Sequence, residues 1–315
     1  MVSEFQFINH IKKQFSLDRI GDDCAVLPQN QTSDLLITAD LLVEDIDFRL
    51  EWTTPELLGH KALAVSLSDI AAMGGTPTSA MLSIGVPPKL WDDGFPEAFY
   101  IGWYQLASQF GIELIGGDTS RSPDKLVIDS IVLGEVPRGK AILRSGARPD
   151  DAVFVSGTLG GASTGLMLLE SGSAKFVDPE AKIINRQLRP MPQVELGKHL
   201  RELGIVTSMI DVSDGLASDL NHICEASGVG AVLDAESIPI DPNLHNVMRF
   251  DESFDAAING GEDFELLCTV AESQLPALVD LSITRIGTVT AQRGTLEIIR
   301  NGAAENLVPS GFQHF

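Results

Sequence analysis

The chain has 315 residues, of which 44% are apolar, 21% charged and 6% aromatic. This length suits two domains, and the composition is that of an ordinary globular protein. The formal net charge is −22, from 44 acidic and 22 basic residues. That charge argues against unaided binding to nucleic acid or to an anionic membrane, because Lys and Arg are the residues that hold phosphates. Phosphates bridged by Mg²⁺ stay compatible with it, since this ion prefers carboxylate and phosphate oxygens.

The first half of the chain alternates helical and strand-like apolar patterns. In chain order, the pattern predicts a helix at 4–15, a strand at 35–37, a helix at 57–73, a strand at 80–86, a helix at 97–110, and strands at 112–115 and 126–135. A polar stretch punctuated by Pro and Gly then covers residues 137–150, which indicates a domain boundary.

The second half restarts the same plan of strand, turn and helix. It predicts strands at 152–156, 206–210, 266–270, 285–289 and 296–299, with helices at 164–171 and about 216–227. This alternation predicts an α/β (α+β) protein of two domains. We place them at residues 1–138 and 139–315.

Cysteine usage and the N-terminal segment indicate the compartment. The cysteines Cys24, Cys224 and Cys268 are widely spaced without a Cys-x-x-Cys pair, which argues against a zinc site or a disulfide framework. Residues 1–15 lack the apolar stretch of a signal peptide. No apolar run approaches the roughly 18 residues that a membrane span needs. We therefore expect a cytoplasmic protein.

Acidic residues recur beside glycines or at junctions between strands and helices. Short carboxylates in such places can converge on a metal ion while backbone N–H groups face a phosphate. Taken singly, each motif also fits a turn residue or a helix cap. Asp69 differs because it lies within an apolar helical pattern, where an unpaired carboxylate is unfavourable, and this favours metal ligation over a structural ion pair. The motifs are Gly21-Asp22-Asp23, Thr38-Ala39-Asp40, Ser68-Asp69, Gly116-Gly117-Asp118, Asp211-Val212-Ser213-Asp214 and Gly260-Gly261-Glu262-Asp263.

Other familiar constellations are missing or ambiguous. The sequence has neither a Walker A loop nor the protein-kinase motifs. The glycine-rich run at 156–165 fits either a phosphate nest or a plain turn. Arg144, near the domain boundary, is either a solvated surface residue or a partner for ATP phosphates. The six histidines show no metal-ligand spacing, and we expect them to be surface or structural residues. Cys24 is better explained as a small buried residue than as a nucleophile.

In this order, the motifs resemble those of the thiamine-monophosphate kinase family. Its superfamily includes aminoimidazole ribonucleotide synthetase, selenophosphate synthetase and a hydrogenase-maturation protein. The resemblance runs from Gly21 to Phe315. It implies an N-terminal domain whose mixed sheet forms a barrel-like core with a second copy in a homodimer. It also implies a C-terminal α/β domain that completes an active site for ATP and several Mg²⁺ ions.

The resemblance also implies roles for single residues. By position, the Mg²⁺ ligands would be Asp23, Thr38, Ala39, Asp40, Asp69, Asp118, Asp211 and Asp214. ATP would contact Gly117, Asp118, Arg144 and Ser213, and thiamine monophosphate would contact Asp47, Glu262 and Phe312. Three positions depart from the family pattern. Ala39 can offer only a backbone carbonyl, Asp47 stands where some members have His, and Phe312 keeps a stacking face without a polar tip.

The implied reaction moves the γ-phosphoryl group of ATP to the phosphate of thiamine monophosphate, giving thiamine diphosphate and ADP. The acceptor phosphate has a second pKa of about 6 and needs no general base near neutral pH. We therefore expect no catalytic base or nucleophile, only charge neutralisation and alignment for direct in-line transfer. Two alternatives stay open. One is another ATP-dependent synthetase of the superfamily; if it were a selenophosphate synthetase, it would use a reactive Cys. The other is a noncatalytic regulator that binds Mg²⁺ and nucleotide.

Overall fold

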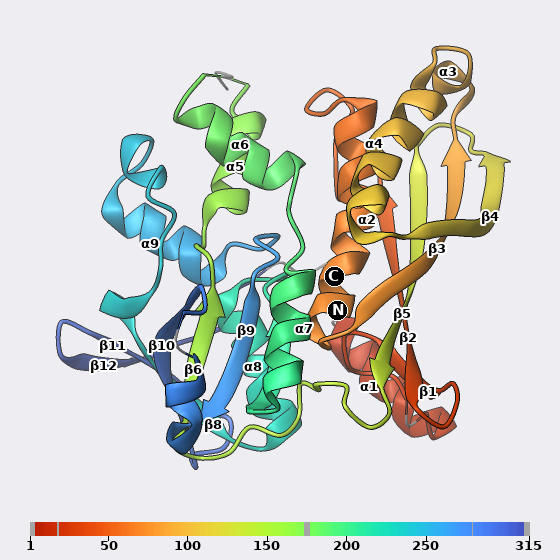
Figure 1. The fold of residues 1–315 in the computed structure, drawn as a ribbon. Coiled ribbons are helices and arrows are strands. Elements are labelled where there is room, and N and C mark those ends of the chain that lie inside the picture. Colours follow the sequence, from red (N-terminus) through yellow and green to blue (C-terminus); the bar gives the residue numbers. More distant parts are fainter. Residues whose placement is uncertain (1–3, 18, 173–176, 279, 312–315) are drawn as a thin grey trace.

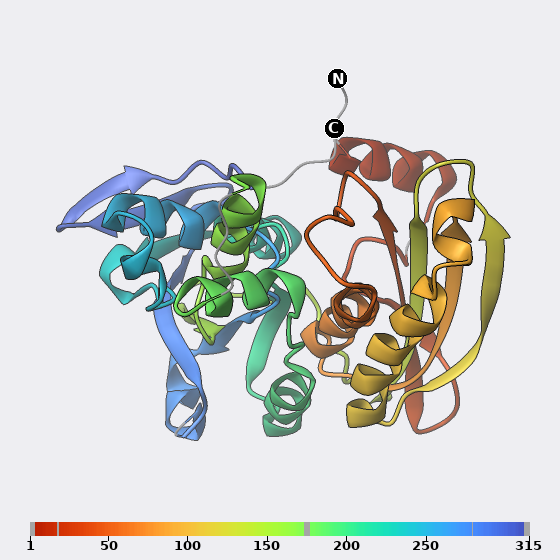
Figure 2. The ribbon, with the colours of Figure 1, turned by 90° about the horizontal axis from the view of Figure 1, so that it is seen from above.

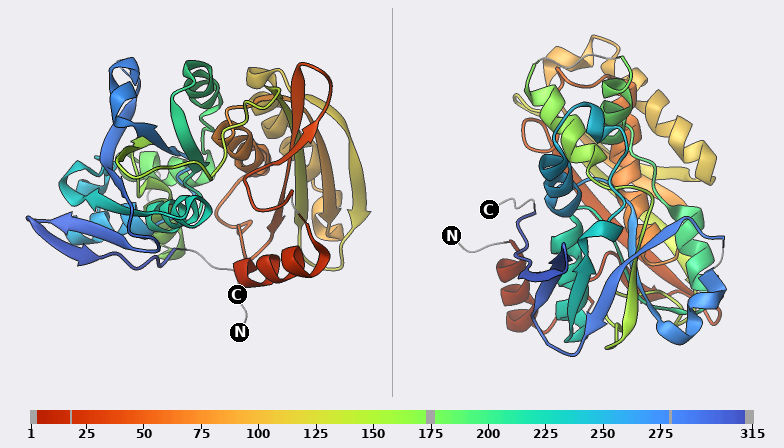
Figure 3. Two further views of the ribbon diagram at one scale, coloured as in Figure 1. Left: turned by 90° about the horizontal axis from the view of Figure 1, so that it is seen from below. Right: turned by 90° about the vertical axis from the view of Figure 1, so that its left-hand side faces the viewer.

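The computed structural model describes residues 4–17, 19–172, 177–278 and 280–311 (Figure 1). Two open, mixed β-sheets lie side by side, one from each half of the chain, and the views of Figure 3 show the same division. The described residues therefore contain two sheets and no closed barrel. The five-stranded first sheet has the order β1 (Ala25–Pro28), β2 (Ser33–Val43), β5 (Val127–Pro137), β3 (Thr76–Val86) and β4 (Glu113–Arg121).

The second sheet has seven strands. Five of its six neighbouring pairs are antiparallel, and β11 pairs with β8 in parallel. The order is β12 (Ala303–Asn306), β11 (Leu296–Arg300), β8 (Gly230–Asp234), β10 (Ile283–Thr290), β6 (Asp151–Ser156), β9 (Leu266–Ala271) and β7 (Val206–Asp211).

Helices pack on both sheets. The first half contributes α1 (Glu4–Phe15), α2 (Pro55–Ala72), α3 (Pro88–Trp91) and α4 (Phe95–Phe110). The second contributes α5 (Gly161–Glu170), α6 (Glu180–Leu188), α7 (Val194–Leu203), α8 (Leu216–Ser227) and α9 (Phe250–Asn259), with short 3₁₀ turns at Ala235–Ser237, Leu244–Asn246 and Glu272–Leu278. No described helix has the length and apolar character that crossing a bilayer requires.

Helix α2 lies at the centre of the molecule, between the first sheet and the second half (Figure 2). The Thr54 hydroxyl caps its first turn by accepting a hydrogen bond from the Leu57 amide at 3.3 Å. Nearly all its residues beyond the first turn are buried, as expected of a helix that is covered on all sides. Two glycines bring neighbouring helices close: a Cβ on Gly102 of α4 or Gly197 of α7 would lie 1.8 or 2.1 Å from a backbone oxygen of α2.

One hydrophobic core surrounds α2 and joins the two halves. It includes Leu36 and Val132 of the first sheet together with Phe154, Met209 and Val270 of the second. A second core lies wholly within the C-terminal half, around α8. Because α2 contacts both sheets, polar side chains on this helix stand at the junction of the halves.

The first sheet differs from the sequence-based prediction at two acidic motifs. Thr38 and Asp40 lie within β2, which pairs with β5 over eleven residues instead of ending at residue 37. The Gly117-Asp118 pair lies within β4, and not in a turn after it. A register shift opposite Ala80 and Met81 inserts one extra residue into β4. Because strand side chains alternate between faces, this shift reverses the direction of every later side chain in β4.

Candidate active site

Three carboxylates from distant segments converge where α2 meets β7. Asp23 precedes β1, Asp69 lies in the last turn of α2, and Asp211 ends β7. Their oxygens lie within 4.8 Å of one another. The structure thus brings together three of the residues expected to bind Mg²⁺, and their role as ligands stays a prediction. We call them the aspartate cluster.

Hydroxyl groups next to the cluster orient its carboxylates. The Ser68 hydroxyl donates a hydrogen bond of 2.5 Å to Asp211 Oδ2, and the Thr38 hydroxyl donates to Asp69 Oδ2. Thr38 and Asp40 lie two residues apart on β2, so both side chains point toward the face that α2 covers. Ser68 was not among the expected site residues, although it adjoins Asp69 in the sequence.

Burial and mutual repulsion disfavour the charged forms of these acids. Burial, and next the charge of Asp23, raise the pKa of Asp211 to about 7. Burial raises the pKa of Asp40 to about 6, and it raises that of Asp69 well above the ordinary range with help from the charges of Asp40 and Asp211. Such a group is stable when protonated or when cations neutralise it.

The donor atoms fit Mg²⁺. Asp23 Oδ2 and Asp40 Oδ2 are buried, and neither accepts a hydrogen bond from any residue that the structure describes. Buried carboxylate oxygens without a donor are unfavourable unless a cation coordinates them. The set is made of oxygens alone, which a hard cation such as Mg²⁺ prefers.

Arg144 is fixed to the edge of the aspartate cluster. Its Nε donates to Asp23 Oδ1 at 2.9 Å, and a terminal guanidinium nitrogen contacts the same oxygen. Its backbone amide donates to both carboxylate oxygens of Asp22, at 3.2 and 3.3 Å. Burial and the charge of Asp23 raise the pKa of Asp22 to about 6. Arg144 is therefore not a solvated surface residue, and Asp22 joins the site although it was not among the expected ligands.

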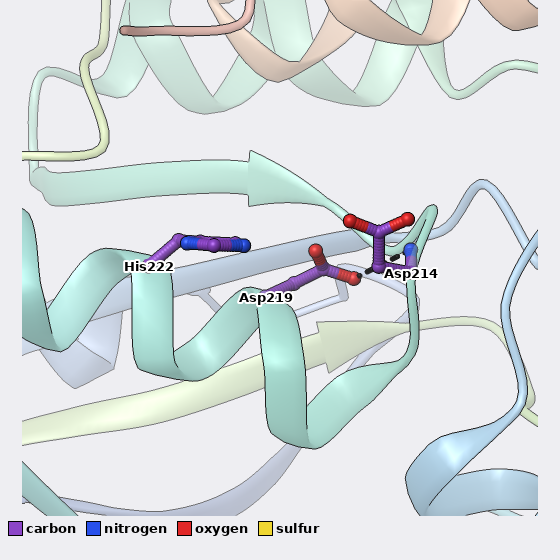
Figure 4. Close-up of side chains that lie close together, drawn as sticks. All are labelled: Asp214, Asp219 and His222. Atoms are coloured by element: carbon purple, nitrogen blue, oxygen red, sulfur yellow. Dashed lines mark hydrogen bonds between the residues drawn. The ribbon is translucent and has the colours of Figure 1, made fainter. Parts of the chain in front are cut away.

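Asp219 organises the loop that follows β7. Its Oδ2 accepts hydrogen bonds from the backbone amides of three consecutive residues, Ser213, Asp214 and Gly215, at 3.1, 3.2 and 3.1 Å. Figure 4 shows the bond from the Asp214 amide. These contacts hold the backbone of the loop that carries the Asp214 side chain. His222 lies beside Asp219, and burial lowers its pKa to about 4. His222 thus belongs to a group of three residues that could hold a cation, and the expectation that the histidines are surface or structural residues stays a prediction.

Glu262 lies against the same loop and carries an ion pair across the junction. Its backbone amide donates to Ser213 O at 2.8 Å. Its Oε1 pairs with Lys61 Nζ at 2.8 Å, and its Oε2 accepts a hydrogen bond from Gln187. Lys61 is buried on α2, seven residues before Ser68, which places the two residues on one side of the helix about 10 Å apart. Sequence analysis missed Lys61, although a charged residue in an apolar helix is the same signal that singled out Asp69.

Comparisons with known proteins identify the family of this chain. The family models described as AIR synthase related protein, N-terminal domain and C-terminal domain, match residues 21–136 and 148–299. The thiamine-monophosphate kinase of Bacillus subtilis (strain 168) is 39% identical over 308 residues, covering 94% of this chain and 93% of the relative. That of Escherichia coli (strain K12) is 38% identical over 312 residues, covering 94% and 91%. The chain belongs to the thiamine-monophosphate kinase family.

A solved structure shows the same fold with ligands. AaThiL complexed with AMPPCP and TMP matches with a TM-score of 0.90 at 34% identity, and the match covers 100% of this chain and 97% of that one. The family resemblance drawn from the acidic motifs is thus confirmed over nearly the whole chain, and so is the two-domain α/β fold.

Two residues implied by the family lie away from the aspartate cluster. Gly117 and Asp118 are exposed on β4, three strands from β2, or about 14 Å at the usual strand spacing. In register, Asp118 aligns with Ser83, Asp129 and Leu41. All four side chains therefore point to the outer face of the sheet, opposite the face that α2 covers.

The remaining expected positions differ in their surroundings. Ala39 is exposed and its side chain points to the outer face of β2. Asp47 lies in the loop after β2, where its Oδ2 accepts a hydrogen bond from the Val43 amide at 2.7 Å. Phe312 lies outside the described residues.

The glycine-rich turn at 156–165 is occupied by an internal carboxylate. The amides of Gly160 and Ala162 donate to Asp263 at 2.6 and 3.0 Å. Burial raises the pKa of Asp263 to about 7, against the effect of these amides and of Arg186. Because both amides already donate to Asp263, they are not available to a phosphate. This argues against the interpretation of the turn as a phosphate-binding nest.

Proposed function

We propose that this chain transfers the γ-phosphoryl group of ATP to thiamine monophosphate, giving thiamine diphosphate and ADP, in a Mg²⁺-dependent reaction. The observation that carries the proposal is the aspartate cluster, in which buried carboxylates from both halves of a thiamine-monophosphate kinase fold converge beside Arg144. The kinase names of the relatives and the ligands of the solved neighbour give the substrate classes.

The residues of this chain would act by binding and orientation. Asp23, Thr38, Asp40, Asp69 and Asp211 would hold Mg²⁺, with Ala39 and Asp214 as further ligands in the proposed set. When bound, Mg²⁺ supplies positive charge that reduces the repulsion between two polyanions. Arg144 offers a guanidinium to ATP phosphates at the edge of the cluster, and Ser213 presents its side chain from the loop that Asp219 holds.

The acceptor needs no deprotonation by the protein, because a phosphate monoester is largely a dianion near neutral pH. The environment of the nearest thiol, that of Cys24, also argues against a cysteine nucleophile. Cys24 is buried, and burial together with the surrounding carboxylates raises the pKa of its thiol well above the usual range. A reactive thiolate needs the opposite environment. We therefore propose direct in-line transfer without a phosphoenzyme.

The acceptor would lie along α2, between the aspartate cluster and Glu262. The separation of about 10 Å between Ser68 and Lys61 suits a molecule with a phosphate at one end and a cationic thiazolium at the other. Glu262, whose carboxylate also contacts Lys61 and Gln187, would offer its negative charge to that cation. Asp47 and Phe312 complete the proposed substrate set.

We also propose a homodimer that covers the outer face of the first sheet. That face exposes Leu41 (58%) and Ile115 (53%) as well as Asp118. Apolar side chains exposed together on a sheet indicate a contact surface. A second copy on this face would give the barrel-like core, and it would let Gly117 and Asp118 of one copy serve the active site of the other.

The domain limits and location follow from similar arguments. The strands of the first sheet end at Pro137 and those of the second begin at Asp151, so we propose domains at 1–138 and 139–315. The three cysteines are free and buried, as a reducing compartment permits, and we propose a cytoplasmic location.

The test of the activity is incubation of the full chain with ATP, Mg²⁺ and thiamine monophosphate, followed by chromatography. We expect thiamine diphosphate and ADP in equal amounts, and no ADP when the acceptor is omitted. ATP binding without any turnover would instead support a regulator. Turnover only with an amide or carbonyl acceptor would support another synthetase of the superfamily.

The dimer proposal has its own test. Asp118→Asn and Asp214→Asn variants should each lose most activity, and mixing the two after dissociation should restore part of it, because one active site of the mixed dimer then has both carboxylates. Failure of the mixture to regain activity, although mixed dimers form, would refute the shared site.

A further inference from the structure

We propose that Asp219 and His222, together with Asp214 of the proposed Mg²⁺ set, form a further cation site beside the aspartate cluster, which binds a divalent transition-metal ion through two carboxylates and one imidazole. One ligand atom from each residue lies within 4.8 Å of the other two. The proposal goes beyond the kinase activity, and it can be tested without nucleotide or acceptor.

Local structure places the three side chains on one side of the start of α8. Gly215 has a φ of +118°, which allows the loop after β7 to turn sharply into the helix. Asp219 and His222 follow at a spacing of three, which makes them neighbours on the helix surface. Asp214, just before the turn, faces them from the loop (Figure 4).

Asp219 provides the observation that points to a ligand. Its side chain is fully buried, with 0% exposure. Oδ2 accepts the three loop amides, whereas Oδ1 is buried and accepts no hydrogen bond from any described residue. In Figure 4 this second oxygen points into the gap between the His222 ring and the Asp214 carboxylate. A buried carboxylate oxygen without a donor is unfavourable, and a cation in the gap would satisfy it.

The donor set indicates the class of ion. Imidazole suits transition-metal ions, whereas Mg²⁺ prefers oxygen ligands alone. Three ligand atoms that each lie about 2.0–2.2 Å from one ion, evenly spaced around it, stand at most about 3.8 Å apart. Because the three atoms lie within 4.8 Å of one another, they would need to approach by about 1 Å at most. Manganese is a suitable probe, because Mn²⁺ accepts carboxylate ligands and is paramagnetic.

A purely structural role for Asp219, as a cap for the loop, makes a different prediction. Capping uses Oδ2 alone and needs neither Oδ1 nor His222. The variant Asp219→Asn separates the two roles, because its amide oxygen can still accept the three backbone amides while an NH₂ group replaces the proposed ligand. His222→Gln removes the imidazole, and His199→Gln, at an exposed position of α7, is the matched control.

The experiment is pulsed electron paramagnetic resonance on the metal-free full chain after Mn²⁺ is added without nucleotide. We expect nitrogen hyperfine coupling to bound Mn²⁺ in the unaltered chain and in His199→Gln, and its loss in His222→Gln. Equilibrium dialysis should show one bound equivalent fewer in His222→Gln and Asp219→Asn, with melting temperatures close to that of the unaltered chain.

Absence of nitrogen coupling in the unaltered chain would overturn the proposal, as would coupling that persists in His222→Gln. An unchanged number of bound ions in Asp219→Asn would overturn it as well. These outcomes are independent of the proposed function, since the kinase assay with Mg²⁺ and thiamine monophosphate is read separately and can succeed whichever result is found here.

Discussion

The substitution Asp211→Asn should stabilise the metal-free protein while it removes activity. Asp211 is 2% exposed, and its environment raises its pKa from 3.8 to about 7. A difference of about three pKa units corresponds to about 4 kcal/mol, at about 1.4 kcal/mol per unit. An amide at this position carries no charge to bury, and it can still accept the hydrogen bond from the Ser68 hydroxyl.

The pH dependence gives the sign of the effect. The folded state holds the Asp211 proton more tightly than the unfolded chain does. The free energy of unfolding of the metal-free protein therefore falls as the pH rises from about 4 to about 7, and stays low above that range. The advantage of the Asn variant should be about 4 kcal/mol at most at pH 8, and less than about 2 kcal/mol at pH 5.

Thermal unfolding followed by circular dichroism, in a chelator at pH 5 and pH 8, measures this difference. We expect the variant to melt higher at pH 8 by about 5–10 °C, whereas the exposed control Asp93→Asn should melt like the unaltered chain. Saturating Mg²⁺ should reverse the order, because only the unaltered chain gains binding energy from the ion. Turnover should fall by at least about 100-fold. A variant no more stable than the unaltered chain in chelator, or a gain equal at both pH values, would refute the argument from burial.

Three further substitutions test other parts of the structure. Lys61→Met should raise KM for thiamine monophosphate by about 10-fold or more while KM for ATP changes little, because the ion pair that holds Glu262 across the junction is lost. The exposed control Lys140→Met should change neither KM value. Equal effects of the two substitutions would contradict the role of Lys61 in binding the acceptor. Gly102→Ala should lower the free energy of unfolding in urea by about 3 kcal/mol or more, because its Cβ would meet a backbone oxygen at 1.8 Å. Gly85→Ala, whose nearest neighbour would be 3.6 Å away, should be tolerated, and similar losses in both would refute the packing argument. Cys24→Ala should keep turnover within about 2-fold. A loss of turnover in this variant would instead support the alternative enzyme that uses a reactive Cys.

Local sequence patterns could predict the elements that local physics determines. Helix α2 follows from its apolar pattern and its glycine stop, and it lies at Pro55–Ala72 against an expected 57–73. Asp69 could be singled out because a carboxylate in such a helix needs a partner. Arg144 could be suspected from its position near the boundary, but its contact with Asp23 depends on how the halves pack.

Features set by strand register and tertiary contact were not predictable. Asp118 points outward only because of the one-residue shift between β3 and β4, and nothing in the local sequence specifies that shift. The approach of Asp214 to His222 depends on the sharp turn at Gly215. The spacing of Asp219 and His222 was visible in the sequence, but it indicates a shared helix face only once α8 is known.

The position of α2 between the two halves has a consequence for synthesis of the chain. The helix is complete at Ala72, but its second side is covered by α7 and β7, and β7 ends at Asp211. At about 5–20 residues per second, the ribosome adds the intervening segment of about 140 residues in about 7–28 s. During that interval the nascent chain holds an apolar helix with one side uncovered, so the N-terminal half should be a client of chaperones that bind exposed hydrophobic surface before the second half emerges.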